Sequence, residues 1–183
     1  MEHEFSTIPF NAALQNAALN FDCGSSSFYN QFIRDRQALD PSFGKTFVFL
    51  TKDHKSIVGY YNIGVGEVTL DNGYQRTKCG GAVHINVLAL DKAYRGKSIS
   101  DEAGKDIHWS DLLLYDCLQR IYNIRETSVG FSFVTLSASK EGHGLYQRFG
   151  FFEMEEDMSF NLQDDEKSGK GIMMYYPLDS EDP

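Results

Sequence analysis

The fold is decided by one segment, Leu145-Tyr146-Gln147-Arg148-Phe149-Gly150-Phe151, because it predicts where a helix ends and the next strand begins. Gly150 stands where the last turn of a helix commonly passes into a left-handed residue. Apolar runs suited to strands lie on both sides, Phe131–Leu136 before it and Phe151–Met154 after it. The sequence therefore predicts a short helix over Lys140–Phe149 between two strands of a sheet.

A second pattern, upstream of the first, predicts the central strand. The run Ala82–Leu90 (AVHINVLAL) is almost continuously apolar, as expected of a strand that is covered on both faces. It ends in Asn86-Val87-Leu88-Ala89-Leu90 and is followed by the more polar Asp91-Lys92-Ala93-Tyr94-Arg95-Gly96. This strand and the stretch after it form the second motif on which the interpretation depends.

Hydrophobic spacing predicts the remaining elements. Apolar side chains at helical intervals, from Trp109 to Ile121, indicate a helix over His108–Tyr122. Ser25 or Ser26 can cap an earlier helix that runs to Leu39. Other segments are predicted as strands or helical turns: Phe5–Phe10, Asn11–Leu19, Thr46–Thr51, Ser56–Leu70 and Met173–Leu178. This order predicts a mixed α/β (α+β) fold with a single central mixed sheet flanked by helices.

The composition is typical of one folded domain. The 183 residues are 42% hydrophobic and 14% aromatic, so we expect a packed core and a single domain over residues 1–183. No apolar run approaches the ~20 residues of a membrane span, and no basic cluster opens the chain, so we expect a soluble, cytoplasmic protein without a membrane segment. Three separated cysteines without a CxxC pair indicate reduced thiols and no metal site.

The net charge of −9 is concentrated near the C-terminal end. Residues 151–183 contain ten acidic residues against Lys167 and Lys170, a balance of −8, and residues 1–150 carry the remaining −1. Tight binding to a nucleic-acid backbone requires clustered Lys and Arg, so this balance argues against it. The one basic concentration is local and has four members: Lys92, Arg95, Lys97 and Lys105.

Together with the order of elements, the two motifs resemble those of the GNAT N-acetyltransferase superfamily, over nearly the whole chain. Asn86–Gly96 looks like the family's core strand, and the resemblance implies that the backbone of Val87, Leu88, Ala89 and Leu90 binds the pantetheine arm of acetyl-CoA. Leu145–Phe151 is similar to the block on the family's last helix that carries a catalytic tyrosine. The resemblance implies the GNAT fold, acetyl-CoA as co-substrate, no metal, and acetyl transfer to a primary amine by direct attack.

A site for the cofactor pyrophosphate is expected at the start of the His108–Tyr122 helix, where unpaired N–H groups attract anions. The family's motif there, Gln/Arg-x-x-Gly-x-Gly/Ala, is degenerate in this chain. One frame leads directly into the helix and implies cofactor contacts from Lys105, Ile107, His108, Trp109 and Ser110. The other frame is Arg95-Gly96-Lys97-Ser98-Ile99-Ser100. We favour the first frame, which makes the stretch between the two an insertion in the cofactor loop. The basic residues of this region would meet the phosphates of CoA or remain solvated.

Tyr146 is the candidate general acid, because a positioned phenol can donate a proton to the departing thiolate, an assistance of about 10²- to 10⁴-fold. The resemblance implies that a backbone N–H near Leu88 meets the developing oxyanion. No residue stands out as the base: Glu67 and His84 could relay a proton through water or be ordinary surface and sheet residues. His143 shares a helical face with Tyr146 and could orient the site or cap the turn.

Three functions stay open. The first is acetylation of an amine of a small molecule or protein. The second is acetylation of the amino group of an aminoacyl-tRNA, because Phe21–Gly24 and Val58–Tyr61 resemble a GNAT branch that includes toxins of toxin–antitoxin pairs. The resemblance implies a homodimer and, for this branch, a small antitoxin-like partner. The third is a CoA-binding GNAT-like module without turnover, which the degenerate anion motif suggests.

Overall fold

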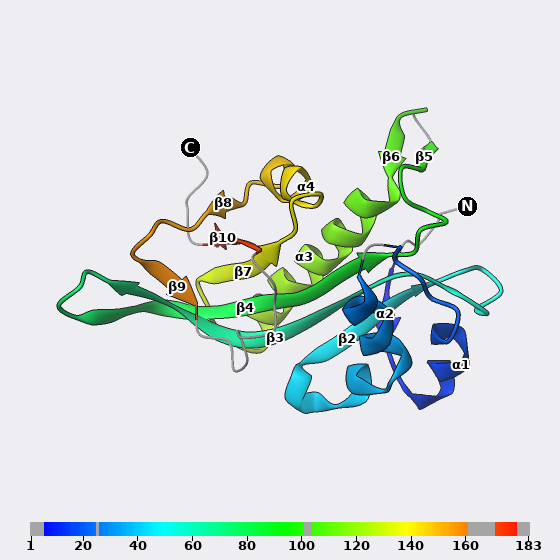
Figure 1. Ribbon diagram of the computed structural model, residues 1–183, viewed down its shortest axis with the longest axis horizontal. Helices are drawn as coiled ribbons and strands as arrows, with labels where there is room; N and C mark the ends of the chain where they lie inside the picture. The colour runs from blue at the N-terminus through cyan, green and yellow to red at the C-terminus, as the bar shows by residue number, and fades with distance from the viewer. Residues whose placement is uncertain (1–5, 25, 101–103, 161–170, 179–183) are drawn as a thin grey trace. The chain divides into compact units, whose positions relative to one another are not determined.

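The computed structural model describes residues 6–24, 26–100, 104–160 and 171–178. In these residues the strands form an eight-stranded mixed sheet in the order β1-β2-β3-β4-β7-β10-β8, with β9 paired to β3. Helices flank this sheet (Figure 1). The prediction of a mixed fold around one central sheet is confirmed.

The chain forms two units, residues 1–63 with 87–122 and residues 64–86 with 123–183. The long strands β3 (Ile57–Asp71) and β4 (Arg76–Leu90) each contribute to both units. A single domain over the whole chain stays a prediction. In the part of the chain that the structure describes, no helix is long and apolar enough to cross a membrane.

In the first unit, the sheet has helices on both faces. β1 (Ile8–Pro9) pairs with β2 (Lys45–Leu50), and β2 is antiparallel to the first half of β3. Consecutive side chains of a strand point to opposite faces. Accordingly, the Tyr60 hydroxyl donates a hydrogen bond to the Tyr29 carbonyl at 2.6 Å, whereas the Tyr61 hydroxyl donates to Oδ2 of Asp116 at 2.7 Å. The two tyrosines thus tie the same strand to helices on its two sides.

The helical segments of the first unit confirm one predicted cap and correct one predicted end. Oγ of Ser26 accepts the N–H of Tyr29 at 3.3 Å, as expected of an N-cap. The helix ends at Arg34 and not at Leu39, because Arg36 adopts a left-handed backbone (φ 63°) that no helix can continue. The segments are η1 (Ala12–Leu14), α1 (Gln15–Ala18), α2 (Ser27–Arg34), η2 (Gln37–Leu39), η3 (Pro41–Phe43) and α3 (Trp109–Thr127).

A cluster of buried apolar side chains joins α1 and α2 to the sheet. Phe21, Ile33 and Tyr60 are each at most 1% exposed, and Val87 and Ala89 of β4 complete the same cluster. The rings of Phe32 and Tyr60 stack with centroids 6.3 Å apart. Alternate residues of the predicted pantetheine strand therefore point their side chains into this core, which leaves their backbone groups as the part that can bind a ligand.

The second unit is built on a parallel pair of strands. β7 (Phe133–Ala138) runs parallel to β4, from Ala82 opposite Phe133 to Ile85 opposite Leu136. The antiparallel strand β10 (Ile172–Pro177) lies on the other side of β7 and carries β8 (Phe152–Glu153). The short helix α4 (His143–Arg148) stands between β7 and β8, as the opening motif predicted.

Some elements were not predicted. β9 (Met158–Phe160) pairs with the second half of β3, and two three-residue strands, β5 (Ser98–Ser100) and β6 (Asp106–His108), form a separate hairpin. β4 begins at Arg76, earlier than Ala82, because its exposed first residues continue a β3–β4 hairpin turned at Gly73 (φ 83°). Such polar, solvent-exposed strand segments carry little hydrophobic pattern.

Candidate active site

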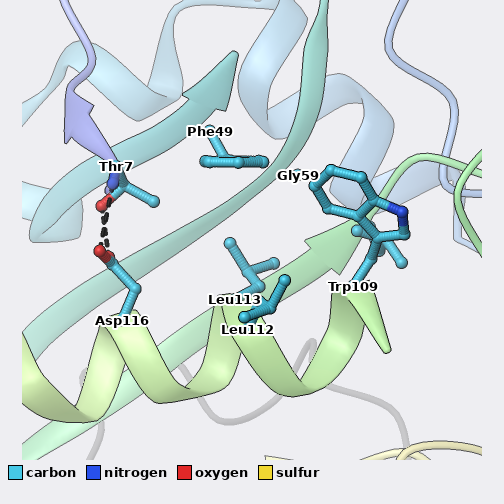
Figure 2. Close-up of a pocket in the computed structure, with 8 residues that line it drawn as sticks. Thr7, Phe49, Gly59, Trp109, Leu112, Leu113 and Asp116 are labelled. Atoms are coloured by element: carbon cyan, nitrogen blue, oxygen red, sulfur yellow. Dashed lines mark hydrogen bonds between the residues drawn. The ribbon is translucent and has the colours of Figure 1, made fainter. Parts of the chain in front are cut away.

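A small apolar pocket in the first unit lies between the end of β4 and the start of α3 (Figure 2). Its empty volume is about 260 Å³, and its lining residues are Thr7, Phe49, Gly59, Leu90, Trp109, Leu112, Leu113 and Asp116. The rings of Phe49 and Trp109 lie 5.6 Å apart. A Cβ at Gly59 would stand 3.0 Å from Cδ2 of Leu113 and 3.1 Å from the Ala89 carbonyl, so a larger residue would have to displace these neighbours by a few tenths of an ångström.

A buried polar network closes one end of this pocket. The hydroxyl of Thr7 donates to Oδ2 of Asp116 at 2.6 Å, its N–H donates to Oδ1 at 3.2 Å, and the Tyr61 hydroxyl donates to Oδ2 at 2.7 Å. Nε of Arg120 donates to the Tyr61 hydroxyl at 2.7 Å, and its guanidinium lies 4.1 Å from the centroid of the Phe47 ring. Burial raises the pKa of Tyr61 above its usual range. The network anchors the segment before β1 to α3.

The start of α3 is brought next to the loop that follows β4. The Trp109 N–H donates to the Lys97 carbonyl at 3.3 Å, and the β5–β6 hairpin closes from Ser98 opposite His108 to Ser100 opposite Asp106. Figure 1 shows this hairpin at the beginning of α3. The two alternative frames of the anion motif are therefore adjacent in the structure, because Lys97 of one frame is hydrogen-bonded to Trp109 of the other.

The predicted cofactor-binding residues of the first unit fall into three groups. Val87 and Ala89 are buried, and Leu88 is half-buried between them. Leu90 and Trp109 come together as walls of the pocket, and Ser110 follows in the first turn of α3. Lys105, Ile107 and His108 were expected as cofactor contacts leading into a helix from His108, but Asp106–His108 is a strand of the hairpin, Ile107 pairs with Ile99, and α3 begins at Trp109.

Lys92 joins two loops through hydrogen bonds to Asp22 and does not lie on an open basic surface. Its ammonium group donates to Oδ2 of Asp22 at 2.6 Å, and its N–H donates to the Asp22 carbonyl at 2.8 Å. Asn30 donates to the same carboxylate at 3.0 Å. The hydrogen bond from Lys92 is the main reason why the pKa of Asp22 is lowered to about 2. The Phe21–Gly24 segment, which carries part of the resemblance to the toxin branch, is thus hydrogen-bonded to the chain that follows β4.

In the second unit, Tyr146 is buried in α4, with 8% of its surface exposed. Its ring meets the Phe151 ring edge-on at 5.8 Å, and its carbonyl accepts the Phe151 N–H at 3.1 Å. Gly150 takes a left-handed backbone (φ 86°) and ends the helix, as predicted. Nε2 of His143 lies 2.8 Å from Oε1 of Glu153, a residue that the sequence did not single out.

The two candidates for a base both have structural partners. Nδ1 of His84 lies 2.8 Å from Oγ1 of Thr135, and its ring centroid lies 4.6 Å from that of Phe160. Burial lowers the pKa of His84 to about 3, which keeps the imidazole neutral and makes it a poor proton acceptor near pH 7. Glu67 pairs with Lys78 at 2.9 Å across the β3–β4 hairpin. These contacts fit an ordinary sheet residue for His84 and an ordinary surface residue for Glu67.

No group of three or more His, Cys, Asp or Glu side chains gathers closely enough to hold a metal ion in the described ranges. The three cysteines are free thiols, two of them buried.

Comparison with known proteins was informative at the level of structure. No family model matches the chain, and no curated protein matches its sequence. Among solved structures, a bacterial toxin superposes with a TM-score of 0.69 at 15% identity, over 93% of this chain and 89% of that one. AtaT complexed with acetyl-methionyl-tRNAfMet gives 0.65 at 13% identity over 94% of both chains, and the KacTA–DNA complex gives 0.64 at 18% over 94% and 92%.

The chain has the GNAT fold. A Trypanosoma brucei acetyltransferase is a further neighbour, with a TM-score of 0.50 and 16% identity over 86% of this chain. Within the GNAT fold of this chain, sequence reasoning located Tyr146 and the β4 strand, but it missed the Asp116 network and Glu153. The i, i+4 spacing of Asp116 and Arg120 on one helix was the only signal of the former. Glu153 gave no signal, since its partner is ten positions away.

Proposed function

We propose that this protein is an acetyl-CoA-dependent N-acetyltransferase that transfers the acetyl group to a primary amine of a small molecule or protein. One observation carries the proposal: in a GNAT fold, the helix that follows the parallel strand β7 bears a buried tyrosine, Tyr146, within the motif expected of the catalytic helix. The resemblance of the motif and the likeness of the fold are independent, because the first depends on local sequence and the second on backbone geometry.

The proposed cofactor site uses the backbone of Val87–Leu90 and the start of α3. Among the described residues, the parallel register of β4 with β7 extends from Ala82 to Ile85 and stops before Val87–Leu90. Backbone N–H and C=O groups of this stretch can then pair with the amides of the pantetheine arm. A backbone N–H near Leu88 would stabilise the oxyanion that forms on the thioester carbonyl.

The pyrophosphate would bind where the two anion frames meet. Ser110 lies in the first turn of α3, and the Lys97 carbonyl already accepts the Trp109 N–H. The N–H groups that follow Trp109 are therefore the ones proposed to bind the anion. Lys97 is exposed near this point and supplies positive charge. Lys92 is left out, because Asp22 already balances its charge.

The proposed reaction is a direct transfer. The neutral amine attacks the carbonyl carbon of the thioester, the C–N bond forms, and the C–S bond breaks as the tetrahedral intermediate collapses. The phenol of Tyr146 donates its proton to the departing thiolate, and water accepts the proton released by the amine. Acetylated amine and CoA are the products, and the phenolate regains a proton from solvent.

The first test is calorimetric titration of the full chain with acetyl-CoA, followed by incubation with labelled acetyl-CoA and a panel of polyamines and peptides. The proposal expects saturable binding and label on an amine. No binding at millimolar cofactor would reject it. Binding without label on any acceptor would instead support a CoA-binding module without turnover.

A second candidate acceptor is the amino group of an aminoacyl-tRNA. The fold likeness to AtaT complexed with acetyl-methionyl-tRNAfMet, over 94% of both chains, favours it. The charge of −8 in residues 151–183 opposes it, because RNA binding requires clustered cations. Aminoacylated tRNA and labelled acetyl-CoA distinguish the two acceptors: label that appears on the RNA and not on polyamines or peptides would establish this candidate.

The same neighbours include complexes of AtaT with the antitoxin AtaR. We include in the proposal a homodimer and a small antitoxin-like partner for the RNA-linked case. Light scattering of the purified chain tests the dimer. Co-expression with any small protein encoded beside it, followed by affinity isolation, tests the partner.

A further inference from the structure

The contact between His143 and Glu153 has no role in the reaction as proposed so far. His143 is the first residue of α4, and Glu153 is the last residue of β8. Nε2 of His143 lies 2.8 Å from Oε1 of Glu153. The histidine side chain is 20% exposed and the carboxylate 56% exposed. The contact thus lies at the rim of the second unit and joins the beginning of the helix to the strand that follows it.

Stability does not account for this contact. The buried Nε2 atom makes no hydrogen bond with any described residue, so the 2.8 Å approach to Glu153 is a close contact without the geometry of a hydrogen bond. A buried polar atom without a hydrogen bond costs free energy, and an ion pair with an exposed carboxylate returns little. The contact is therefore expected to contribute little to the stability of the fold.

The contact instead completes a closed path around Tyr146. His143 and Tyr146 are three residues apart on α4 and share a face. The Phe151 ring packs edge-on against the Tyr146 ring, and the Phe151 N–H donates a hydrogen bond to the Tyr146 carbonyl. Glu153 follows Phe151 by two residues and stands opposite Met174, a fully buried residue of β10. From Glu153 the path returns to His143.

Such a path matters because α4 has only six residues. A helix of this length is not stable by itself and takes its position from its contacts. The C-terminal end of α4 is fixed by Gly150 and Phe151. At its N-terminal end the side chain of His143 reaches the adjacent strand, so that a rotation of the helix about its axis, which would swing the Tyr146 ring, would break this contact.

We propose that His143 and Glu153 are positioning residues for Tyr146: their contact fixes the rotation of α4 and so the direction in which the phenol points. This inference rests on the proposed acetyl transfer. Neither residue touches substrate or exchanges a proton in this role. Their effect is expected in the chemical step and not in the binding of acetyl-CoA.

A double-mutant cycle of His143→Ala with Tyr146→Phe tests the inference in the full-length enzyme. H143A is expected to lower kcat by about ten-fold, with KM for acetyl-CoA unchanged, because only the transition state uses the oriented phenol. In the Y146F background, H143A is expected to have no further effect. E153A should reproduce the loss, and H143Q, which keeps a polar group near Glu153, should recover part of the activity.

The matched control is Gln147→Ala, an exposed position on the same helix, which should leave kcat and KM unchanged. An equal loss in both backgrounds, or a kcat of H143A equal to that of the wild type, would overturn the positioning role while leaving the acetyl transfer intact. Thermal melts of all variants exclude loss of the fold as the cause; if H143A melts early, the cycle is completed with E153Q. A wild-type chain that transfers no acetyl group overturns the proposed function, and the inference with it.

Discussion

The Asp116 network and the His143–Glu153 contact differ in how completely their polar atoms are satisfied. In the first unit, both oxygens of Asp116 accept hydrogen bonds, and Arg120 supports the same network through the Tyr61 hydroxyl. In the second unit, the buried Nε2 of His143 approaches a carboxylate without forming a hydrogen bond. A saturated network resists rearrangement, whereas an incompletely satisfied group costs stability and persists where it serves another purpose. The first network is expected to stabilise the fold, and the second contact is the one proposed to position Tyr146.

The largest expected effect is the loss of the phenol. Tyr146→Phe should lower kcat by about 10²- to 10⁴-fold with nearly unchanged affinity for acetyl-CoA, because the proton donor acts only in the chemical step. Steady-state kinetics and calorimetry measure the two quantities. Tyr175→Phe on β10, whose ring also packs in the second unit, is the control and should retain activity. A Y146F enzyme as fast as the wild type would place the acid elsewhere.

The next effect should appear in the first unit and in stability alone. Asp116→Ala removes the acceptor of three hydrogen bonds: the Thr7 N–H loses its acceptor, and of the Thr7 and Tyr61 hydroxyls only one can donate to the other. The free energy of unfolding should therefore fall by about 2–3 kcal/mol. Urea denaturation measures it. Glu126→Ala, at an exposed acidic position of the same helix, should change little. If D116A proved as stable as the wild type, the contrast between the Asp116 network and the His143–Glu153 contact would disappear.

His84 should make stability depend on pH, with a smaller effect. Its pKa is lowered from 6.5 to about 3 by burial, so below pH 6.5 the unfolded chain binds a proton that the folded chain does not. The free energy of unfolding should therefore be complete above pH 6.5 and fall as the pH decreases toward 3, by at most about 1.4 kcal/mol per pH unit.

The pH effect is measured by urea denaturation between pH 4 and pH 7. His84→Gln should flatten this dependence. The control is His54→Asn, because His54 is exposed and Asn accepts its left-handed backbone (φ 58°). A steep slope that survives in H84Q would show that other groups cause it.

The smallest expected effect separates two lysines of one loop. Lys92 is paired with Asp22, whereas Lys97 makes no ion pair with a described residue. Lys97→Met should weaken acetyl-CoA binding by about three- to ten-fold through loss of a phosphate contact, and Lys92→Met should leave the affinity unchanged. Calorimetry in low salt compares them. Equal effects of the two substitutions would mean that the anion site is misplaced.

Local sequence was a good guide wherever one element determines its own structure. The Ser26 cap, the end of α4 at Gly150, and the apolar strands β2, β4 and β7 were predicted from residues within a few positions of one another. The same reasoning failed for β5, β6 and β9, which have three residues each and few apolar side chains. A strand of that length is stable only because of its partner, and the partner does not appear in a local pattern.

The same distinction between local patterns and contacts of distant segments applies to the candidate site. Tyr146 could be found from the sequence because its neighbours Gly150 and Phe151 belong to the same short motif. The preference for the Lys105–Ser110 frame stays a prediction, because the frames are separate in the chain and meet only when the β5–β6 hairpin closes. The pairing of Lys92 with Asp22, seventy positions away, could not be predicted from the sequence either.

What the sequence by itself determined is the order and type of the principal elements; it also supplied Tyr146 as the candidate proton donor, which stays a prediction. Periodicity, capping and turn chemistry act between neighbours, so the chain carries them directly. Only the tertiary structure decided which cations remain available for a phosphate, which histidine is held neutral, and that Glu153 stands beside His143. Those outcomes depend on burial and on contacts between distant residues, and neither exists until the chain has folded.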